Sequence, residues 1–182
     1  MRNKGTIGGS LAHADPAGDW PAAVLALNAQ LVVASRNGER TIPADEFFVD
    51  LLTTALEPGE ILREIRVAKA VGRAAHAYTK MPHPASGFAV VGVAANLSLN
   101  AGGSCDRASI GITGVSSKAY RATAVESALR GATLDEGAIA NAAAHAADGI
   151  DVNGDVFASA DYRRHLAVVY TKRAIAAAMG KG

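Results

Sequence analysis

Residues 89–99 carry the pattern that most restricts how this chain can fold. Apolar side chains stand at every second position, and the positions between them become polar at Asn96 and Ser98. This period of two predicts a strand with one buried face. The run 108–114 alternates in the same way and is a natural antiparallel partner. With a further strand starting at Ala77, a three-stranded antiparallel sheet is predicted.

The last third of the chain shows helical patterns. The first predicted helix covers 122–130 and stops at Gly131, which suits a left-handed C-terminal cap. Thr133 and Glu136 have the spacing of a capping box that begins the next helix. The longest helix is predicted over 159–179. We therefore expect an α+β protein whose three-stranded antiparallel sheet packs on a helical bundle.

Composition changes in the poorly patterned stretch AKAVGRAAHA, residues 68–77, and a domain boundary is predicted there. The first domain, residues 1–70, shows a short helix and several short strands. Asn37 and Gly38 supply the left-handed pair of a tight hairpin in this domain. The second domain, residues 71–182, holds the sheet and the helical bundle.

Charge and cysteine content exclude several classes of function. Eighteen Lys and Arg against seventeen Asp and Glu give a formal net charge of +1, without the basic excess typical of nucleic-acid binding. Cys105 is the only cysteine, so no internal disulfide and no zinc or iron–sulfur site is predicted, and no metal ligands are assigned. No apolar run approaches the roughly twenty residues of a membrane span. The N-terminal residues lack the pattern of a signal peptide, and a cytoplasmic protein is predicted.

The segment KGTIGGS, residues 4–10, is the strongest candidate for binding chemistry. Its adjacent glycines, Gly8 and Gly9, let backbone amides approach a phosphate without a Cβ in the way, and the alternative is an ordinary glycine turn. Asp15 and Asp19 follow in a loop that opens a helix. One of these carboxylates can cap the helix while the other faces a ligand hydroxyl.

The run RNKGTIGGSLAHADPAGDWPAAVLAL resembles the second flavin-binding segment of a known family. This family is the FAD-binding medium subunit of molybdenum hydroxylases, the carbon monoxide dehydrogenase and xanthine dehydrogenase group. Further stretches resemble that subunit in order, so that the similarity covers almost the whole chain: FFVDLLTTALEPGEILREIRV, AYTKMPHPASGFAVVGVAANLSL, ASIGITGVSSKAYRATAVESAL and SADYRRHLAVVYTKRAI.

The resemblance implies a set of cofactor-binding residues. The family segment that holds the FAD pyrophosphate matches Thr6, Ile7, Gly8, Gly9 and Ser10, where Ser10 replaces the commoner asparagine. Asp15 and Asp19 match its D-P-x-x-D element, and Asp19 is the better candidate for a flavin ribityl or ribose hydroxyl. Leu62 is expected to pack near the isoalloxazine. Lys80 is expected to stabilise negative charge on the reduced ring, and its alternative is a solvated strand-end lysine.

The resemblance also implies a role. Residues 1–70 would be the second half of a flavin-binding α/β domain, and the chain an electron-transfer subunit with FAD but no catalytic residue of its own. Its partners would be an iron–sulfur small subunit and a molybdenum-binding large subunit carrying the molybdenum cofactor. A first FAD-binding subdomain has no match here, so the chain holds only half of the FAD site. Either the chain is a truncated product or a separate chain supplies that subdomain. The alternative is a flavin-free structural or assembly module.

Overall fold

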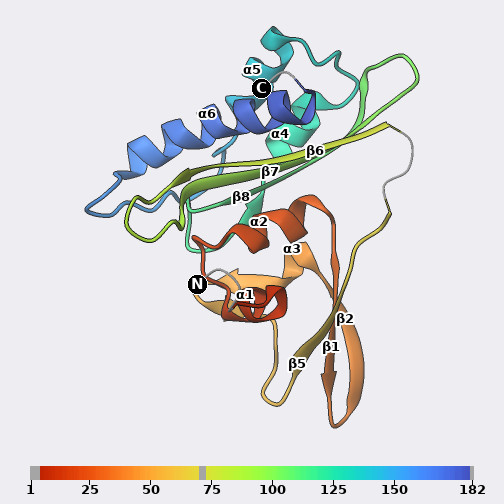
Figure 1. Cartoon of the computed structure of the whole chain (residues 1–182), viewed down its shortest axis with the longest axis vertical. Helices are drawn as coiled ribbons and strands as arrows, with labels where there is room; N and C mark the ends of the chain where they lie inside the picture. Colours follow the sequence, from red (N-terminus) through yellow and green to blue (C-terminus); the bar gives the residue numbers. More distant parts are fainter. Residues whose placement is uncertain (1–4, 70–72, 181–182) are drawn as a thin grey trace.

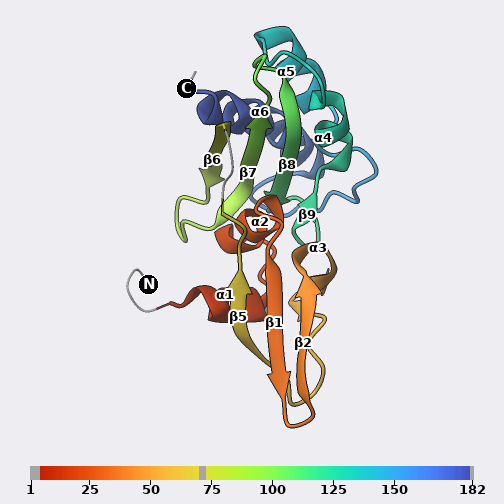
Figure 2. The same cartoon turned by 90° about the vertical axis from the view of Figure 1, so that its right-hand side faces the viewer.

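The computed structural model describes residues 5–69 and 73–180. In its first part, a three-stranded antiparallel sheet has the order β2-β1-β5, with a two-stranded ribbon of β3 and β4 beside it. The strands are β1 (Gln30–Ser35), β2 (Gly38–Pro43), β3 (Phe48–Asp50), β4 (Thr53–Thr54) and β5 (Ile61–Arg66). The helices are α1 (Ile7–His13), α2 (Asp19–Ala26) and α3 (Ala44–Phe47). Helix α1 packs against β5 (Figure 2).

The second part is a four-stranded antiparallel sheet in the order β6-β7-β8-β9. Its strands are β6 (Arg73–Pro82), β7 (Ala89–Leu99), β8 (Cys105–Thr113) and β9 (Tyr120–Arg121). Helices α4 (Thr123–Leu129), α5 (Glu136–Ala143) and α6 (Ala160–Ala178) cover one face of this sheet, and α2 lies on the other (Figure 1). The α2 helix thus belongs to the first part of the sequence but rests on the second.

The α+β class and the antiparallel sheet packed on helices are confirmed. Two details differ from the sequence expectation. The first strand of the sheet already runs from Arg73 instead of from Ala77, and a short fourth strand, β9, pairs with Gly111 and Ile112 of β8. The expected domain boundary near residue 70 falls on residues 70–72, which lie outside the described residues.

Helix ends are set by local chemistry, and two of the expected caps are wrong. Gly131 has a φ of +78°, but the residue before it, Arg130, is extended and the Gly131 amide bonds to the Cys105 carbonyl, so Gly131 forms a turn after α4 and does not cap the helix. The N-cap of α5 is Asp135, whose carboxylate accepts a hydrogen bond from the amide of Ala138 at 2.8 Å. Thr133 therefore does not begin this helix as a capping box. Asp is as good an N-cap as Thr, and it stands directly before the helix.

The apolar core has two main clusters. The larger lies between the sheet and α4–α6 and includes Val93, Ile112 and Ile175, each fully buried. The smaller lies in the first part, around Leu11 and Phe47. Helix α2 contributes to this second cluster through one face and touches the four-stranded sheet through its alanines.

Small residues allow α2 to lie directly on the sheet. Ala22 and Ala26 of α2 form a buried contact cluster with Ala94 of β7. At Gly111 of β8 a Cβ would collide with the backbone carbonyl of Ala22, and backbone cannot be displaced as a flexible side chain can. Glycine is required at position 111 for this close approach.

A polar network fixes the C-terminal end of α2. Arg121 of β9 forms a bidentate ion pair with Glu126 of α4, at 2.6 and 2.8 Å, and both side chains are largely buried. The same guanidinium donates to the Asn28 Oδ1 atom at 2.5 Å and to the Ser109 hydroxyl at 3.2 Å. Asn28 adopts a φ of +49° just past the helix and donates to Ser109 at 2.9 Å.

Replacing Gly111 with alanine should lift α2 from the sheet. We expect Gly111→Ala to lower the free energy of unfolding by about 1–3 kcal/mol, the usual cost of overpacking a tight contact. Gly102→Ala is the matched control, because a Cβ there meets only the Asn100 side chain at 3.4 Å. Denaturant unfolding of both variants checks the prediction, and equal stabilities would contradict the role of Gly111.

Candidate functional site

The glycine segment forms the beginning of α1. Thr6 is the N-cap, and its hydroxyl accepts a hydrogen bond from the amide of Gly9 at 3.0 Å. A Cβ on Gly9 would lie 2.9 Å from the Thr6 hydroxyl oxygen, closer than such atoms approach. A side chain at position 9 would therefore require a small shift of the Thr6 hydroxyl.

Gly8 stands on the open side of the same turn. A Cβ placed on Gly8 would meet nothing within 4 Å. The amides of Ile7 and Gly8 lie in the first helical turn, where a helix supplies no acceptor of its own. No side chain covers the backbone at Gly8, so an anionic oxygen can approach its amide directly. Ser10, half-buried, lies on the other side, with its hydroxyl toward Gly18.

Neither aspartate of the following loop caps α2. The N-cap is Gly18, and no side chain accepts a hydrogen bond from the first turn. Asp15 instead accepts from the amide of Ala17 at 2.9 Å, which closes a tight turn. The expectation of a carboxylate cap is wrong because Asp15 is used within the loop and Asp19 is held by strand β6.

Asp19 and Lys80 meet in one ion pair. The Lys80 Nζ atom lies 2.7 Å from the Asp19 Oδ2 atom and donates to the carbonyl of Gly87 at 2.8 Å. The other carboxylate oxygen accepts a hydrogen bond from the Tyr78 hydroxyl at 2.6 Å. Lys80 is therefore not a free, solvated strand-end lysine. The structure brings two of the expected site residues together from opposite parts of the sequence.

Tyr78 is the residue of this cluster that sequence reasoning missed. Its burial raises the pKa of the hydroxyl above the usual value, and the neighbouring Asp19 carboxylate raises it further, so Tyr78 stays a hydrogen-bond donor. A signal was present, because Tyr78 and Lys80 stand two positions apart on a strand and hence share a face.

Leu62 lies in a different place from this pair. It is half-buried on β5 and packs against the apolar cluster of the first part. Just before it, the Glu60 carboxylate accepts two hydrogen bonds from Arg40, at 2.7 and 2.8 Å, and one from the amide of Glu57 at 2.7 Å. Glu60 thus fixes the turn that leads into Leu62, and these bonds lower its pKa to about 2.

Two further findings apply to residues 5–69 and 73–180. No group of three or more His, Cys, Asp or Glu side chains there is arranged to hold a metal ion. Within the same ranges, no helix has both the length and the apolar character needed to cross a membrane.

Comparison with known families gives two matches in sequence order. Residues 1–69 match the family described as "FAD binding domain in molybdopterin dehydrogenase". Residues 76–178 match the "CO dehydrogenase flavoprotein C-terminal domain".

Individual relatives agree with these matches. The chain is 36% identical over 179 residues to the "6-hydroxypseudooxynicotine dehydrogenase complex subunit alpha" of Paenarthrobacter nicotinovorans, covering 98% of this chain and 60% of that protein. It is 36% identical to the carbon monoxide dehydrogenase medium chain of Hydrogenophaga pseudoflava, covering 100% and 63%. A solved carbon monoxide dehydrogenase structure from Hydrogenophaga pseudoflava superposes with a TM-score of 0.93 at 37% identity, over 99% of this chain and 62% of that one.

Both matched domains are parts of one class of protein, the flavoproteins of molybdenum-dependent dehydrogenases. The chain belongs to the family of FAD-binding medium subunits of molybdenum hydroxylases, the family of the carbon monoxide dehydrogenase medium chains. The resemblance noted in the sequence is thereby confirmed. The chain spans 60% of the length of one curated relative and 63% of another.

The hydrogen bonds of Glu60 with Arg40 and with the amide of Glu57 predict a specific pH dependence of stability. Because folding lowers the pKa of Glu60 from 4.5 to about 2, its contribution to stability is full above pH 4.5 and is lost as the pH falls toward 2. Glu60→Gln should therefore lower the thermal midpoint at pH 7, and the gap to the parent should close on acidification.

Glu46→Gln is the control for this experiment, since Glu46 is an exposed residue of α3 and takes no part in the ion pair of Arg40 with Glu60. Thermal unfolding followed by circular dichroism between pH 7 and pH 2 measures both gaps. A Glu60→Gln gap of constant size across this range would show that the ion pair does not stabilise the fold.

Proposed function

We propose that this chain is the FAD-binding, electron-transfer subunit of a molybdenum-dependent oxidoreductase. The main support for the proposal is the backbone at Gly8, which no side chain covers and which lies inside the segment that matches an FAD-binding domain. FAD bound there would accept electrons from one partner and pass them on to another. The residues of this chain bind and orient the cofactor.

The described residues fit a dinucleotide in three places. The first turn of α1 offers the amides of Ile7 and Gly8 as donors for a diphosphate, while the Gly9 amide is already bonded to the Thr6 hydroxyl. Asp19 presents a carboxylate that is already oriented by Tyr78 and Lys80, and it can accept from a ribityl or ribose hydroxyl. Leu62 offers an apolar side chain on β5 for the isoalloxazine ring. Ser10 and Asp15 support this set by shaping the loop between α1 and α2.

Lys80 supplies the cation of the proposed site. Its ammonium group is held by Asp19 and by the Gly87 carbonyl, and its side chain is 26% exposed. A positive charge in this position favours the reduced, more negative form of a flavin. In the proposed site, Asp19 both holds Lys80 in place and binds the cofactor.

The proposed route of electrons runs through partner subunits. An iron–sulfur subunit would deliver electrons that leave the substrate at the molybdenum cofactor of a large subunit, and FAD would deliver them to an acceptor. The resemblance to the family implies that a further segment or chain completes the FAD site. Affinity for FAD depends on contacts from both sides.

The rival function is a flavin-free structural or assembly module of the same complex. It keeps the fold and the subunit contacts but not the cofactor. The two differ in whether the chain takes up FAD, alone or in its complex, and flavin absorbance of the purified protein separates them.

Gly8→Ala tests the proposed cofactor site. The added methyl group has free space within the protein, so it should leave stability unchanged or slightly raise it while it obstructs the diphosphate. We expect FAD affinity, measured by flavin fluorescence in the chain and in its complex, to fall about tenfold or more, as when a charge-assisted hydrogen bond is lost.

Gly137→Ala is the matched control, because Gly137 is the second residue of α5 as Gly8 is of α1. If Gly8→Ala binds FAD as well as this control does, the diphosphate does not bind at α1. No uptake of FAD by the parent protein in any assembly would favour the structural module.

A further inference from the structure

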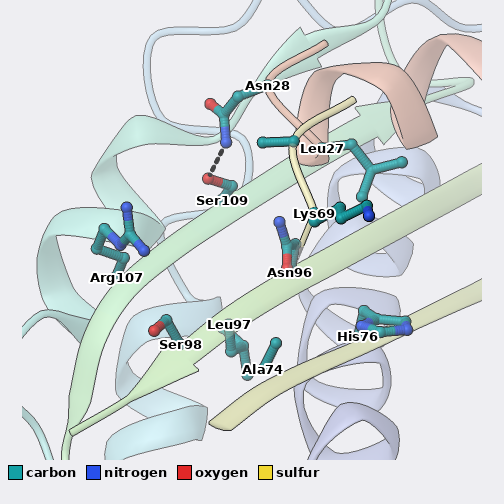
Figure 3. A pocket seen from close by; sticks show the side chains of 11 residues that line it. Leu27, Asn28, Lys69, Ala74, His76, Asn96, Leu97, Ser98, Arg107 and Ser109 are labelled. Atoms are coloured by element: carbon teal, nitrogen blue, oxygen red, sulfur yellow. Dashed lines mark hydrogen bonds between the residues drawn. The ribbon is translucent and has the colours of Figure 1, made fainter. Parts of the chain in front are cut away.

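Helix α2 covers only part of its face of the four-stranded sheet. Beyond its C-terminal end the strands leave a cavity of about 460 Å³, lined by Leu27 and Asn28 and by Ala68 and Lys69 of the β5–β6 connection. Figure 3 shows Lys69 beside Leu27 above the strands. This cavity lies at the opposite end of α2 from Asp19, so it is separate from the proposed flavin site.

Polar side chains form the floor of the cavity in register. His76, Asn96 and Ser109 are directly paired across β6, β7 and β8, and they form one row. Ser98 and Arg107 are paired in the next row on the same face. Adjacent strands are about 4.8 Å apart, so neighbouring members of a row can contact one small ligand together.

Ser109 lines this cavity and keeps a hydroxyl proton to donate. It is only 8% exposed, and its oxygen accepts hydrogen bonds from Asn28 at 2.9 Å and from Arg121 at 3.2 Å. A hydroxyl has two acceptor positions and one proton, so the proton remains to be donated. Among the described residues, this proton has no hydrogen-bond acceptor. A buried donor without an acceptor is costly, which a ligand oxygen would relieve.

The charges around the cavity have one sign. Lys69 and Arg107 line it, together with the imidazole of His76, and none of the lining residues in the described part of the chain is Asp or Glu. Within the described ranges, the side chains of Lys69 and His76 have no hydrogen bond or ion pair to another residue, and Arg107 forms only a long, exposed ion pair with its neighbour Asp106, at 3.9 Å. The cavity therefore has an excess of donors and positive charge in a chain whose net charge is only +1.

We propose that this cavity binds a small anionic molecule through a phosphate or carboxylate group. Ser109 and Asn96 contact the anionic oxygens from the floor, and Lys69 and Arg107 approach from the two sides. Asn96 can do so because only one of its amide protons is used, in a bond to the Ala26 carbonyl at 3.1 Å.

Calorimetric titration of the full chain with inorganic phosphate and with succinate tests the proposal. We expect saturable binding of one anion per chain. Whichever of the two anions binds with the higher affinity shows whether the cavity prefers a phosphate or a carboxylate group. Lys69→Gln and Arg107→Gln should each weaken binding about tenfold, the effect of losing one charged hydrogen bond. Both side chains are exposed, so neither change should alter the thermal midpoint.

Two control variants locate the anion. Arg36→Gln removes the same charge from the exposed β1–β2 hairpin and should change affinity less than twofold. Gly8→Ala should leave phosphate binding unchanged, since it affects only the α1 site. The proposal is overturned by absence of saturation, by an equal effect of Arg36→Gln, or by a loss of binding in Gly8→Ala, which would place the anion at α1.

Discussion

The packing of α2 against the four-stranded sheet is the contact on which the rest of this structure depends. The helix belongs to the sequence region that matches an FAD-binding domain, but it rests on strands of the C-terminal domain. Asp19 at one end and Asn28 at the other are both hydrogen-bonded to that sheet. The pairing of Asp19 with Lys80, which brings the two halves of the proposed site together, exists only because α2 lies there.

This contact combines close backbone approach with buried polar bonds. Ala22, Ala26, Ala94 and Gly111 bury little apolar surface, so burial alone would let the helix shift along the sheet. The polar network favours one register, because a shift of α2 would break the hydrogen bonds of Asn28 to Arg121 and Ser109, while the ion pair of Arg121 with Glu126 would remain. We infer that the alanines allow the approach and that the polar groups at the two ends determine the position.

Local patterns predicted the elements of the fold, and contacts distant in sequence determined what could not be predicted. Alternation located the strands at 89–99 and 108–114, and Gly131 marked a helix end. The resemblance to a family singled out Asp19 and Lys80. Their pairing could not be foreseen, because they lie 61 positions apart and local spacing says nothing of such contacts. The choice of Asp135 over Thr133 as a cap was equally invisible, since both residues favour that position.

The cavity beside Ser109 likewise leaves no motif in the sequence. Its floor comes from three strands and its walls from a helix end and a connection, so its residues gather only through the sheet register. Asn28 and Arg121 both seat α2 and hold Ser109 as a donor, so an anion bound at Ser109 adds to the bonds that keep α2 in place.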